Sequence, residues 1–392
     1  MQNRVSLMLW NWQQPDWPNF TWDKTPLARA EQQFLVEAGT LVGAVKHLDG
    51  GERDQIVVEA ISTEALTTSE IEGEILDCAS VQSSIRKQLG LATDNRHVRP
   101  AEQGIAEMMV DLYRSFAAPL SDDMLFAWHR MLVSGRRDLK DVGRYRTSDE
   151  LMQVVSGAIY EATVHFEAPP SSEVASQMEG FTTWFNRTRP GGREPLPALT
   201  RAGIAHLYFE CIHPFEDGNG RIGRGIAEKA LAQGLGQPTL TALAATILAR
   251  RKTYYEGLEL ANKGNEITRW LAFFAGVAIE AQRRTVALVE FLIDKTKLMD
   301  RLRGQLNQRQ EKALLRMLRE GPEGFAEGLS AGKYATITGA SPATATRDLV
   351  ELLAKGALIR TGERKHARYR LSVPLRPVPH VNINERGEIV YS

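Results

Sequence analysis

The stretch that decides the fold is His213-Pro-Phe-Glu-Asp217-Gly-Asn-Gly-Arg221-Ile-Gly-Arg224. Apolar residues at helical spacing lie on both sides, so we predict one helix ending near Ile212 and another running from the motif to about Gly234. The glycines between them predict a tight turn, and the first backbone N–H groups of the second helix are free to bind an anion. Arg221 and Arg224 stand three apart and share one face of that helix start. The stretch therefore predicts a phosphate-binding turn between two helices.

Composition limits the classes of protein to which the chain can belong. The 392 residues carry 48 Lys and Arg against 48 Asp and Glu, so any binding to nucleic acid must come from a local patch of charge. The length predicts two or three domains. Cys78 and Cys211 are the only cysteines, and their separation argues against a disulfide scaffold or a zinc site. No segment resembles a membrane span, so we expect a cytoplasmic protein with no membrane partner.

Two common phosphate-binding motifs do not fit the stretch. Its glycines, Gly218, Gly220 and Gly223, satisfy the Gly-x-Gly-x-x-Gly spacing of dinucleotide-binding folds, but that motif follows a β-strand. A helical pattern precedes it here, which argues against a Rossmann fold, and the chain has no Walker lysine motif.

The individual residues of the stretch indicate transfer of a nucleotidyl group. His213 is a candidate general base, because an unperturbed imidazole pKa of about 6.5 suits proton transfer at neutral pH. Asp217 offers the hard oxygen ligand that Mg²⁺ prefers, and two arginines can clamp phosphoryl oxygens with paired donors. Together they fit attack by a deprotonated hydroxyl on a metal-bound nucleoside triphosphate.

At these residues the sequence resembles the Fic (filamentation induced by cAMP) family. The family signature is His-x-Phe-x-Asp/Glu-Gly-Asn-Gly-Arg-x-x-Arg, and every specified position is matched from His213 to Arg224. The resemblance implies a mainly α fold, with a Fic-type helical core and a small β-hairpin flap. It also implies transfer of AMP from ATP to a Ser, Thr or Tyr hydroxyl of a target protein, with release of pyrophosphate.

The resemblance gives each residue of the motif a role. His213 would be the base, Asp217 would hold Mg²⁺ or Mn²⁺, and Phe215 would anchor the loop in the core. The residues that bind the phosphates of ATP would lie at the helix start, with the two arginines on the β- and γ-phosphates: Gly218, Asn219, Gly220, Arg221 and Arg224.

Two features outside the motif also receive a role from the resemblance. Short β-prone runs on both sides of residue 160 predict a hairpin, which would be the flap that aligns the target chain. The flap residues would be Val154, Val155, Ser156 and Gly157. Tyr254 and Tyr255 are candidates for the walls of the adenine site, and core packing explains these two tyrosines equally well.

An upstream stretch, Thr67-Thr-Ser-Glu-Ile-Glu-Gly73, interrupts the helical pattern. By themselves its hydroxyl residues fit a helix start, and Glu72 fits a solvated charge. The stretch also resembles the family's inhibitory pattern, Ser/Thr-x-x-x-Glu-Gly/Asn, with Thr68, Glu72 and Gly73 at the specified positions. The resemblance implies a class II arrangement, in which Glu72 pairs with Arg224 and removes the clamp for the γ-phosphate.

The order of domains follows from these assignments. Residues 1–95 are the predicted N-terminal helical module, 96–300 the catalytic core, 305–375 a smaller domain and 376–392 a tail. The N-terminal module resembles one that precedes many bacterial Fic domains. It begins with four of the seven tryptophans, which we interpret as a small aromatic core or a docking strip: Trp10, Trp12, Trp17 and Trp22.

The domain at 305–375 resembles a winged helix-turn-helix, because three helical patterns precede a hairpin rich in positive charge. Candidate DNA contacts on its third helix and in its hairpin are Thr344, Arg347, Arg364, Lys365 and Arg368. Winged helices also dock proteins, and so few charges alone would support only weak, salt-sensitive binding to DNA.

Three functions therefore stay open. The first is a protein adenylyltransferase inhibited by its own Glu72, and the second is an enzyme that uses Glu72 to activate water and remove AMP. The third is a DNA-binding transcriptional regulator whose Fic core senses a nucleotide, although a complete catalytic set argues against a purely binding role. UMP or phosphocholine transfer also fits, because the motif does not read the base. The predicted partners are ATP and a target protein, for which the chain itself is one candidate, and a homodimer is compatible with the sequence.

Overall fold

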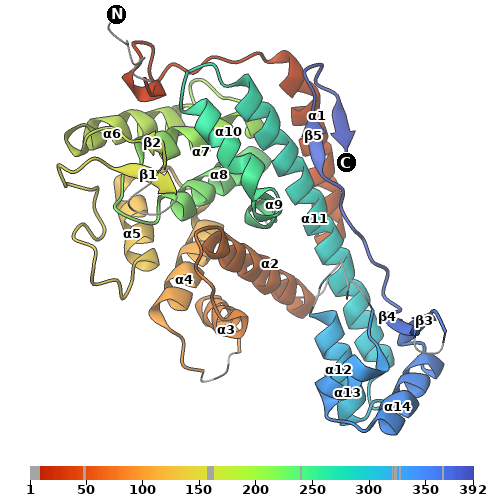
Figure 1. Cartoon of the computed structure of the whole chain (residues 1–392). Helices are drawn as coiled ribbons and strands as arrows, with labels where there is room; N and C mark the ends of the chain where they lie inside the picture. Colours follow the sequence, from red (N-terminus) through yellow and green to blue (C-terminus); the bar gives the residue numbers. More distant parts are fainter. Residues whose placement is uncertain are drawn as a thin grey trace, which may run out of the picture. The chain divides into compact units, whose positions relative to one another are not determined.

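The computed structural model describes residues 9–46, 50–92, 94, 96–156, 163–238, 241–319, 321, 325, 328–363 and 366–392. In this part the chain is mainly α-helical, as the sequence predicts, and it forms three short antiparallel strand pairs (Figure 1). It divides into two compact units. The larger unit comprises residues 1–40, 57–282 and 380–392, and the smaller comprises 41–56 and 283–379. No described helix is both long enough and apolar enough to cross a membrane.

The larger unit contains the helices that surround the predicted motif. Three helices contribute residues to both units: α1 (Thr25–Lys46), α2 (Gly50–Ile71) and α11 (Thr268–Arg301). The others are α3 (Cys78–Gln88), α4 (Pro100–Ser115), α5 (Asp122–Leu132), α6 (Ser171–Arg187), α7 (Ala198–Ile212), α8 (Asn219–Leu235), α9 (Leu243–Ala249) and α10 (Arg251–Ala261). Its strand pairs are β1 (Gln153–Ser156) with β2 (Thr163–Glu167), and β5 (Val381–Ile383) with β6 (Ile389–Tyr391).

Helices α7 and α8 form the centre of the larger unit. They pack closely against each other, and nearly every residue of both is buried, which is typical of helices enclosed on all sides. Helix α8 continues past the predicted end at Gly234 because this glycine packs against Ala198. It ends one residue later, where Gly236 adopts φ 68°. The motif between α7 and α8 is therefore held by the most rigid part of the unit.

One other helix prediction needs correction. Helix α2 runs without a break to Ile71, because the Thr67 hydroxyl donates to Thr63 O at 2.7 Å and remains compatible with a helix interior. Further along the chain, α9 and α10 are separated at Arg250.

Within the larger unit, the tryptophan-rich segment packs against β2, α6 and α7. Trp12 Nε1 donates to Glu167 O at 2.6 Å, and Trp17 Nε1 donates to Gln177 Oε1 at 2.7 Å. Trp17 also makes an edge contact with Tyr208 of α7, with ring centroids 5.2 Å apart. The polar atom of each ring thus finds a partner while the ring covers apolar surface, as expected of a docking strip.

The C-terminal tail folds back as the β5–β6 hairpin, which the sequence did not predict. Val381 N donates to the buried Glu280 Oε2 at 3.0 Å, and Arg250 Nη1 donates to Val381 O at 2.8 Å. Gly276 leaves room for this strand, because a Cβ there would lie 2.6 Å from Val381 O. The hairpin therefore belongs to the larger unit.

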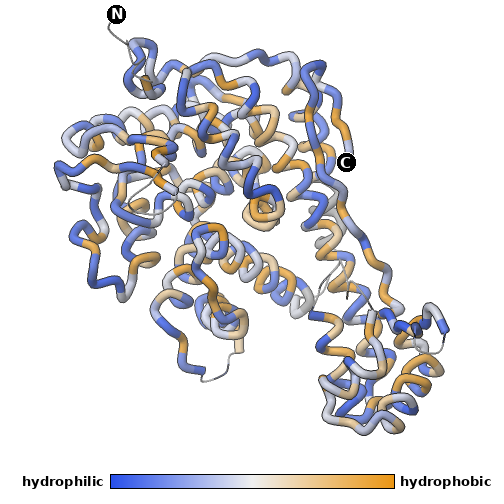
Figure 2. The backbone as a smooth tube through the Cα atoms, viewed as in Figure 1, coloured by the Kyte–Doolittle hydropathy of each residue, from blue (hydrophilic) through white to orange (hydrophobic). Residues whose placement is uncertain are grey.

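The smaller unit contains α12 (Gln308–Leu318), α13 (Ala331–Thr338), α14 (Pro342–Ala354), β3 (Leu358–Thr361) and β4 (Arg368–Leu371). Each helix begins at a side-chain cap, supplied by Asn307, Ser330 and Ser341. Hydrophobic and hydrophilic residues alternate along these helices (Figure 2), and Leu314 and Leu349 are among the buried ones. Leu329 makes an antiparallel bridge to Tyr369, which adds a third short segment to the β3–β4 pair.

Candidate active site

The loop between α7 and α8 is fixed by its own side chains. His213 ends α7 in the left-handed region, at φ 50°, and Gly218 precedes α8 at φ 84°. The Asn219 side chain accepts from Phe215 N at 2.9 Å and donates to Phe215 O at 2.8 Å. Phe215 is fully buried and stacks on His129, with ring centroids 4.3 Å apart. Because the Asn219 side chain is used in this way, its backbone N–H, together with those of the following residues, is what α8 offers to an anion.

Arg146 binds the backbone carbonyl groups of the same loop. Its Nε donates to His213 O at 2.8 Å and its Nη2 to Pro169 O at 2.5 Å, while its backbone N–H donates to Pro214 O at 2.9 Å. Burial lowers the pKa of Arg146 to about 10. Arg146 therefore stays charged at neutral pH and fixes the backbone on which His213 stands.

His213 is a neutral imidazole at the edge of a cavity. Its side chain is 18 % exposed, and burial lowers the pKa of His213 to about 4, an effect that the charge of Arg146 strengthens. The imidazole Nδ1 lies 3.9 Å from Glu210 Oε2. A neutral ring can accept a proton, which general-base catalysis requires.

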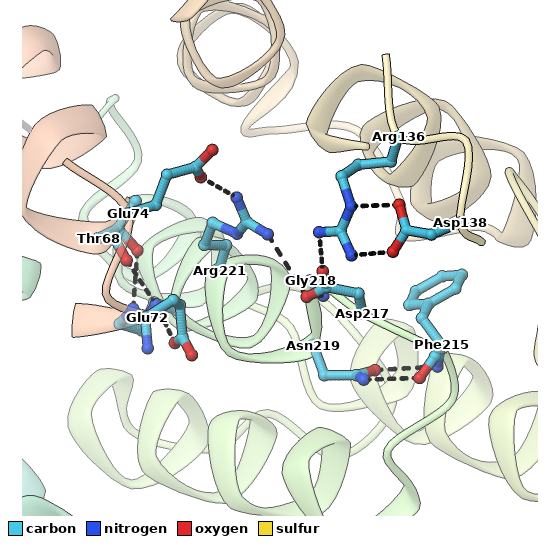
Figure 3. Close-up of polar contacts among 11 residues, drawn as sticks. Thr68, Glu72, Glu74, Arg136, Asp138, Phe215, Asp217, Gly218, Asn219 and Arg221 are labelled. Carbon is cyan, nitrogen blue, oxygen red and sulfur yellow. Dashed lines mark hydrogen bonds and ion pairs between the residues drawn. The ribbon is translucent and has the colours of Figure 1, made fainter. Parts of the chain in front are cut away.

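Arg224 is buried and fully engaged by α2 and the residue after it (Figure 3). Its Nη2 donates to Glu72 Oε1 at 2.7 Å and to Thr68 O at 2.9 Å, and its Nε donates to Thr68 Oγ1 at 2.7 Å. Burial alone lowers the pKa of Arg224, but the nearby charge of Glu72 raises it above its usual value. Gly73 turns the chain away at φ 83° directly after this contact. Two residues of the predicted inhibitory pattern, Thr68 and Glu72, thus contact the second arginine of the motif.

A second ion-pair chain connects the same loop to Asp217. Glu74 Oε2 lies 2.7 Å from Arg221 Nη1, and Arg221 Nη2 lies 3.5 Å from Asp217 Oδ1. The other carboxylate oxygen of Asp217 accepts from Arg136 Nη1 at 2.5 Å, and Arg136 also binds Asp138 (Figure 3). Carboxylates and guanidinium groups therefore alternate from Glu74 to Asp138.

Asp217 fits a magnesium ion that arrives with a triphosphate better than a resident metal. Its side chain is 34 % exposed and presents hard oxygen atoms beside the free N–H groups of α8. Among the described residues, no group of three His, Cys, Asp or Glu side chains gathers to hold a metal. Mg²⁺ commonly uses one or two carboxylates and completes its shell with phosphate oxygens and water. A metal bound here has to compete with Arg136 for Asp217.

A cavity of about 580 Å³ opens beside the loop, a size suited to a nucleotide. It is lined by His213, Gly220 and Arg224, by both tyrosines of α10, and by three of the four flap residues: Val154, Val155 and Ser156. Gly157, the fourth, lies outside the described residues. Tyr254 is buried and bonds His206 Nε2 through its hydroxyl at 2.8 Å, whereas Tyr255 is 40 % exposed. Tyr254 thus belongs to both the core and the cavity wall.

The strand pair β1–β2 stands over this cavity. The four residues of β1 are exposed, and its register against β2 shifts between Val154 and Val155. His165 of β2 links β1 to α10, because its Nε2 lies 2.6 Å from Ser156 Oγ and its Nδ1 lies 3.0 Å from Glu259 Oε2. The free edge of β1 is available to an extended peptide.

The candidate DNA contacts lie in the smaller unit and do not join this site. Arg347 is exposed on α14 and Arg368 is half-buried on β4. Thr344 binds the hydroxyl of Ser341 at 2.9 Å and so takes part in the start of α14. Arg364 and Lys365 lie outside the described residues.

Four polar residues of the site were not singled out from the sequence: Glu74, Arg136, Arg146 and Glu210. Each is one charged residue among many, and nothing in its spacing marks it. Arg136 lies 81 positions before Asp217, and Glu74 lies 147 positions before Arg221. Such pairs become visible only in three dimensions.

A buried helix pair that places a histidine, an acid and two arginines around an α-helix N-terminus defines a Fic-type site. Residues 119–231 match the Fic/DOC family, and residues 10–91 match a domain of unknown function (DUF4172). The chain therefore contains a Fic domain over residues 119–231.

Known proteins with related sequences and folds agree with this assignment. A protein adenylyltransferase Fic of Nematostella vectensis is 23 % identical over 252 residues, covering 63 % of this chain and 51 % of that protein. The protein adenylyltransferase fic-1 of Caenorhabditis elegans is 29 % identical over 147 residues, covering 37 % and 25 % respectively. The chain thus spans between a quarter and about half of the length of these curated relatives. A Fic domain containing signaling protein from Bacteroides thetaiotaomicron shares the fold, with a TM-score of 0.50, 15 % identity and coverage of 67 % of this chain and 98 % of that one.

Proposed function

We propose that this protein is an adenylyltransferase that transfers AMP from ATP to a hydroxyl of a target protein and is inhibited by its own Glu72. One observation carries the proposal. A neutral His213, the start of α8 and Arg224 line one cavity of about 580 Å³, beneath a strand with a free edge. Relatives named protein adenylyltransferase support the same activity.

The reaction follows from the chemistry of these groups. A target hydroxyl gives its proton to the free imidazole nitrogen of His213, and its oxygen attacks the α-phosphorus of ATP. The bond from that phosphorus to the bridging oxygen breaks, and pyrophosphate leaves with the electron pair. The N–H groups of α8 and the two arginines stabilise the charge that develops on the phosphates. When bound at Asp217, Mg²⁺ supplies further charge neutralisation.

Glu72 inhibits by occupying Arg224. While the two are paired, Arg224 cannot donate to the γ-phosphate, so ATP loses the contact that orients its leaving group. Glu72 also lies directly against Gly220, at the start of α8. The carboxylate therefore adds negative charge where a triphosphate has to bind.

The test uses ATP labelled at the α-phosphate, together with intact-mass and peptide mass spectrometry. We expect Glu72→Gly to incorporate label into itself or into a protein of a lysate, and Glu72→Gly/His213→Ala to incorporate none. Glu70→Gly is the matched control, because Glu70 is exposed in the last turn of α2, two residues before Glu72. Absence of label from the Glu72→Gly protein, or equal label in the double variant, would reject the proposal. The added mass also separates AMP from UMP or phosphocholine.

Removal of AMP is a second candidate, favoured by the position of Glu72. Its side chain is one-third exposed and lines the same cavity as His213, so its carboxylate can hold a water molecule there. The substrate for the test is a target protein labelled by Glu72→Gly. Faster release of AMP by the wild-type protein than by Glu72→Gln, tested with Mg²⁺ and with Mn²⁺, would show removal, and equal rates would exclude it.

DNA binding by the smaller unit is a third candidate. The order α12, Leu329 bridge, α13, α14, β3 and β4 resembles a winged helix, and Arg347 is exposed on α14. Gel-shift measurements over a range of salt concentrations test it. Sequence-selective retention at moderate salt that is lost in Arg347→Gln would support a regulator, whereas retention that disappears with modest salt would leave only electrostatic attraction.

A further inference from the structure

Glu210, in the last turn of α7, is a buried acid that the proposed reaction does not use. Its side chain is 12 % exposed and lines the cavity that holds His213. Its Oε1 has no hydrogen-bond partner among the described residues. An unpaired buried carboxyl oxygen is costly, which suggests that this residue is retained for a purpose other than stability.

The two oxygens of Glu210 face two different histidines. Oε2 lies 3.9 Å from Nδ1 of His213. Oε1 lies against Gly223 of α8. Nδ1 of His206 lies against the same glycine and, like Oε1, has no hydrogen-bond partner among the described residues. A Cβ at Gly223 would overlap Oε1 and stand 3.2 Å from His206 Nδ1. Both unpaired atoms therefore lie against the same glycine of α8, without a direct contact between them.

In their protonation states at neutral pH, Glu210 and the two histidines offer complementary hydrogen-bond donors and acceptors. Burial raises the pKa of Glu210 to about 8, which Arg224 opposes and Glu72 reinforces, so the group is a neutral acid at neutral pH. Burial lowers the pKa of His206 to about 3 and that of His213 to about 4, so both imidazoles are neutral. The titratable groups that surround Glu210 are Glu72, His206, Cys211, His213, Arg224 and Tyr254.

A neutral carboxylic acid has one donor and one acceptor, which matches the two histidines. The His206 ring bonds Tyr254 through Nε2, 2.8 Å away, which leaves its Nδ1 on the side of the ring that faces Gly223 of α8. Oε2 can accept the Nδ1 proton of His213. The main-chain carbonyl of Glu210 acts in the same sense, because a hydrogen bond to it raises the pKa of His213. In a helix this carbonyl would accept from residue 214, but Pro214 has no N–H.

We propose that Glu210 is a positioning residue for His213, which keeps the imidazole proton on Nδ1 and turns the Nε2 lone pair toward the cavity. The 3.9 Å separation closes to a hydrogen bond when His213 engages a hydroxyl. The proposal deepens the proposed function, because it rests on His213 as the base. Glu210 would act on His213 in the way that a third residue orients the base of a catalytic triad.

The first measurement needs no catalysis. Histidine-labelled full-length protein is examined by ¹⁵N NMR, which distinguishes the two neutral tautomers of each ring. We expect His213 of the wild-type protein to carry its proton on Nδ1, and Glu210→Ala to shift it toward a mixture of tautomers. Glu210→Gln should retain the wild-type tautomer, because an amide also presents one acceptor and one donor. His129, which stacks on Phe215, is the internal control and should not change.

The second measurement is made in the Glu72→Gly background. Glu210→Ala should lower kcat on the order of 10- to 100-fold at an unchanged KM for ATP, the range typical of partners that orient a functional histidine. Glu210→Gln should restore most of kcat across the pH profile. Glu179→Gln, an exposed carboxylate on α6, controls for loss of charge. Thermal melting of each variant separates loss of folding from loss of positioning.

The outcomes distinguish the two proposals. An unchanged His213 tautomer in Glu210→Ala, or a Gln variant that behaves like the Ala variant, would overturn the role of Glu210. If the Glu72→Gly protein transfers no AMP at all, the proposed function fails, and the NMR result still decides whether Glu210 positions His213.

Discussion

The carboxylate of Glu72 lies directly against the Cα of Gly220, in the first turn of α8. A Cβ at this position would overlap Glu72 Oε1 and stand 3.1 Å from Arg224 Nη1. The glycine at position 220 therefore leaves room for Glu72, and also for the phosphate that the proposed function places there. This relationship makes the pairing of Glu72 with Arg224 sensitive to one methyl group on another helix.

Gly220→Ala is expected to expel Glu72 from Arg224. In the wild-type background it should lower the free energy of unfolding by about 1–3 kcal/mol, because the methyl group overpacks the contact. In the Glu72→Gly background the same change should cost little, since the overlapping carboxylate is absent. Urea unfolding of the four proteins completes the double-mutant cycle, and equal losses in the two backgrounds would contradict the contact.

Glu74→Gln should raise the affinity for ATP. Glu74 pairs with Arg221 at 2.7 Å, so the ATP phosphates compete with this carboxylate for the guanidinium. Exposed pairs contribute about 0.2–1 kcal/mol, and Glu74 is partly exposed, so we expect a gain of up to about fivefold over the Glu72→Gly background alone. Isothermal titration with ATP measures the gain. Glu70→Gln serves as the matched control, and an affinity equal to that control would show that Glu74 is not a second inhibitory residue.

Arg136→Gln should lower the Mg²⁺ concentration needed for half-maximal nucleotide binding. Arg136 holds Asp217 at 2.5 Å, and a metal ion has to displace it. The pair is largely exposed, which limits the expected change to a few-fold. Nucleotide binding is titrated with Mg²⁺ in the Glu72→Gly background. Arg137→Gln, at the neighbouring exposed position, is the control, and a higher Mg²⁺ requirement in Arg136→Gln would mean that Arg136 helps to bind the triphosphate instead.

His213 should stay neutral across the whole neutral range. The pKa of His213 is lowered to about 4, mainly by burial, whereas Glu72 raises it slightly, so removing Glu72 lowers it further. In the Glu72→Gly background we therefore expect no acid loss of kcat near the ordinary histidine pKa of about 6.5. A kcat profile between pH 5 and 8 that falls with an apparent pKa near 6.5, at constant circular dichroism, would contradict a buried neutral base.

The buried His206 should make the protein less stable in acid. Its pKa in the folded protein, about 3, lies below the ordinary histidine pKa of 6.5, so the unfolded chain binds the proton more tightly. The stability that neutral His206 contributes is complete above about pH 6.5 and declines as the pH falls toward the folded pKa. Glu210, with its raised pKa, acts in the opposite direction and weakens stability as the pH rises toward 8.

The test compares variants, so that other groups cancel. The free energy of unfolding of His206→Gln, measured in urea from pH 7 to pH 4.5, should fall less steeply than that of the wild-type protein. Parallel curves would show that His206 is not held neutral by the fold.

How much of the fold and the site could be predicted from the sequence depends on how far apart along the chain the interacting residues lie. The helix pair, the turn and the candidate phosphate-binding residues follow from twelve consecutive positions, because helical periodicity and glycine act locally. The caps at Ser121 and Ser341 are equally local, because each serine side chain accepts from the backbone N–H three residues later. The helix break expected at Thr67 was wrong, because the threonine hydroxyl found a backbone acceptor one turn earlier.

The sequence by itself determined the chemistry of the motif: a histidine, an acid and two arginines at the start of one helix. It also indicated Glu72 as their partner, through a resemblance rather than through geometry. Only the tertiary structure decided that Arg136 occupies Asp217, that Glu74 occupies Arg221 and that Glu210 lies beside His213. These contacts join charged groups whose free energy depends on burial and on a few ångströms of separation. Neither quantity exists until the chain folds, which is why the state of the site had to be found in three dimensions.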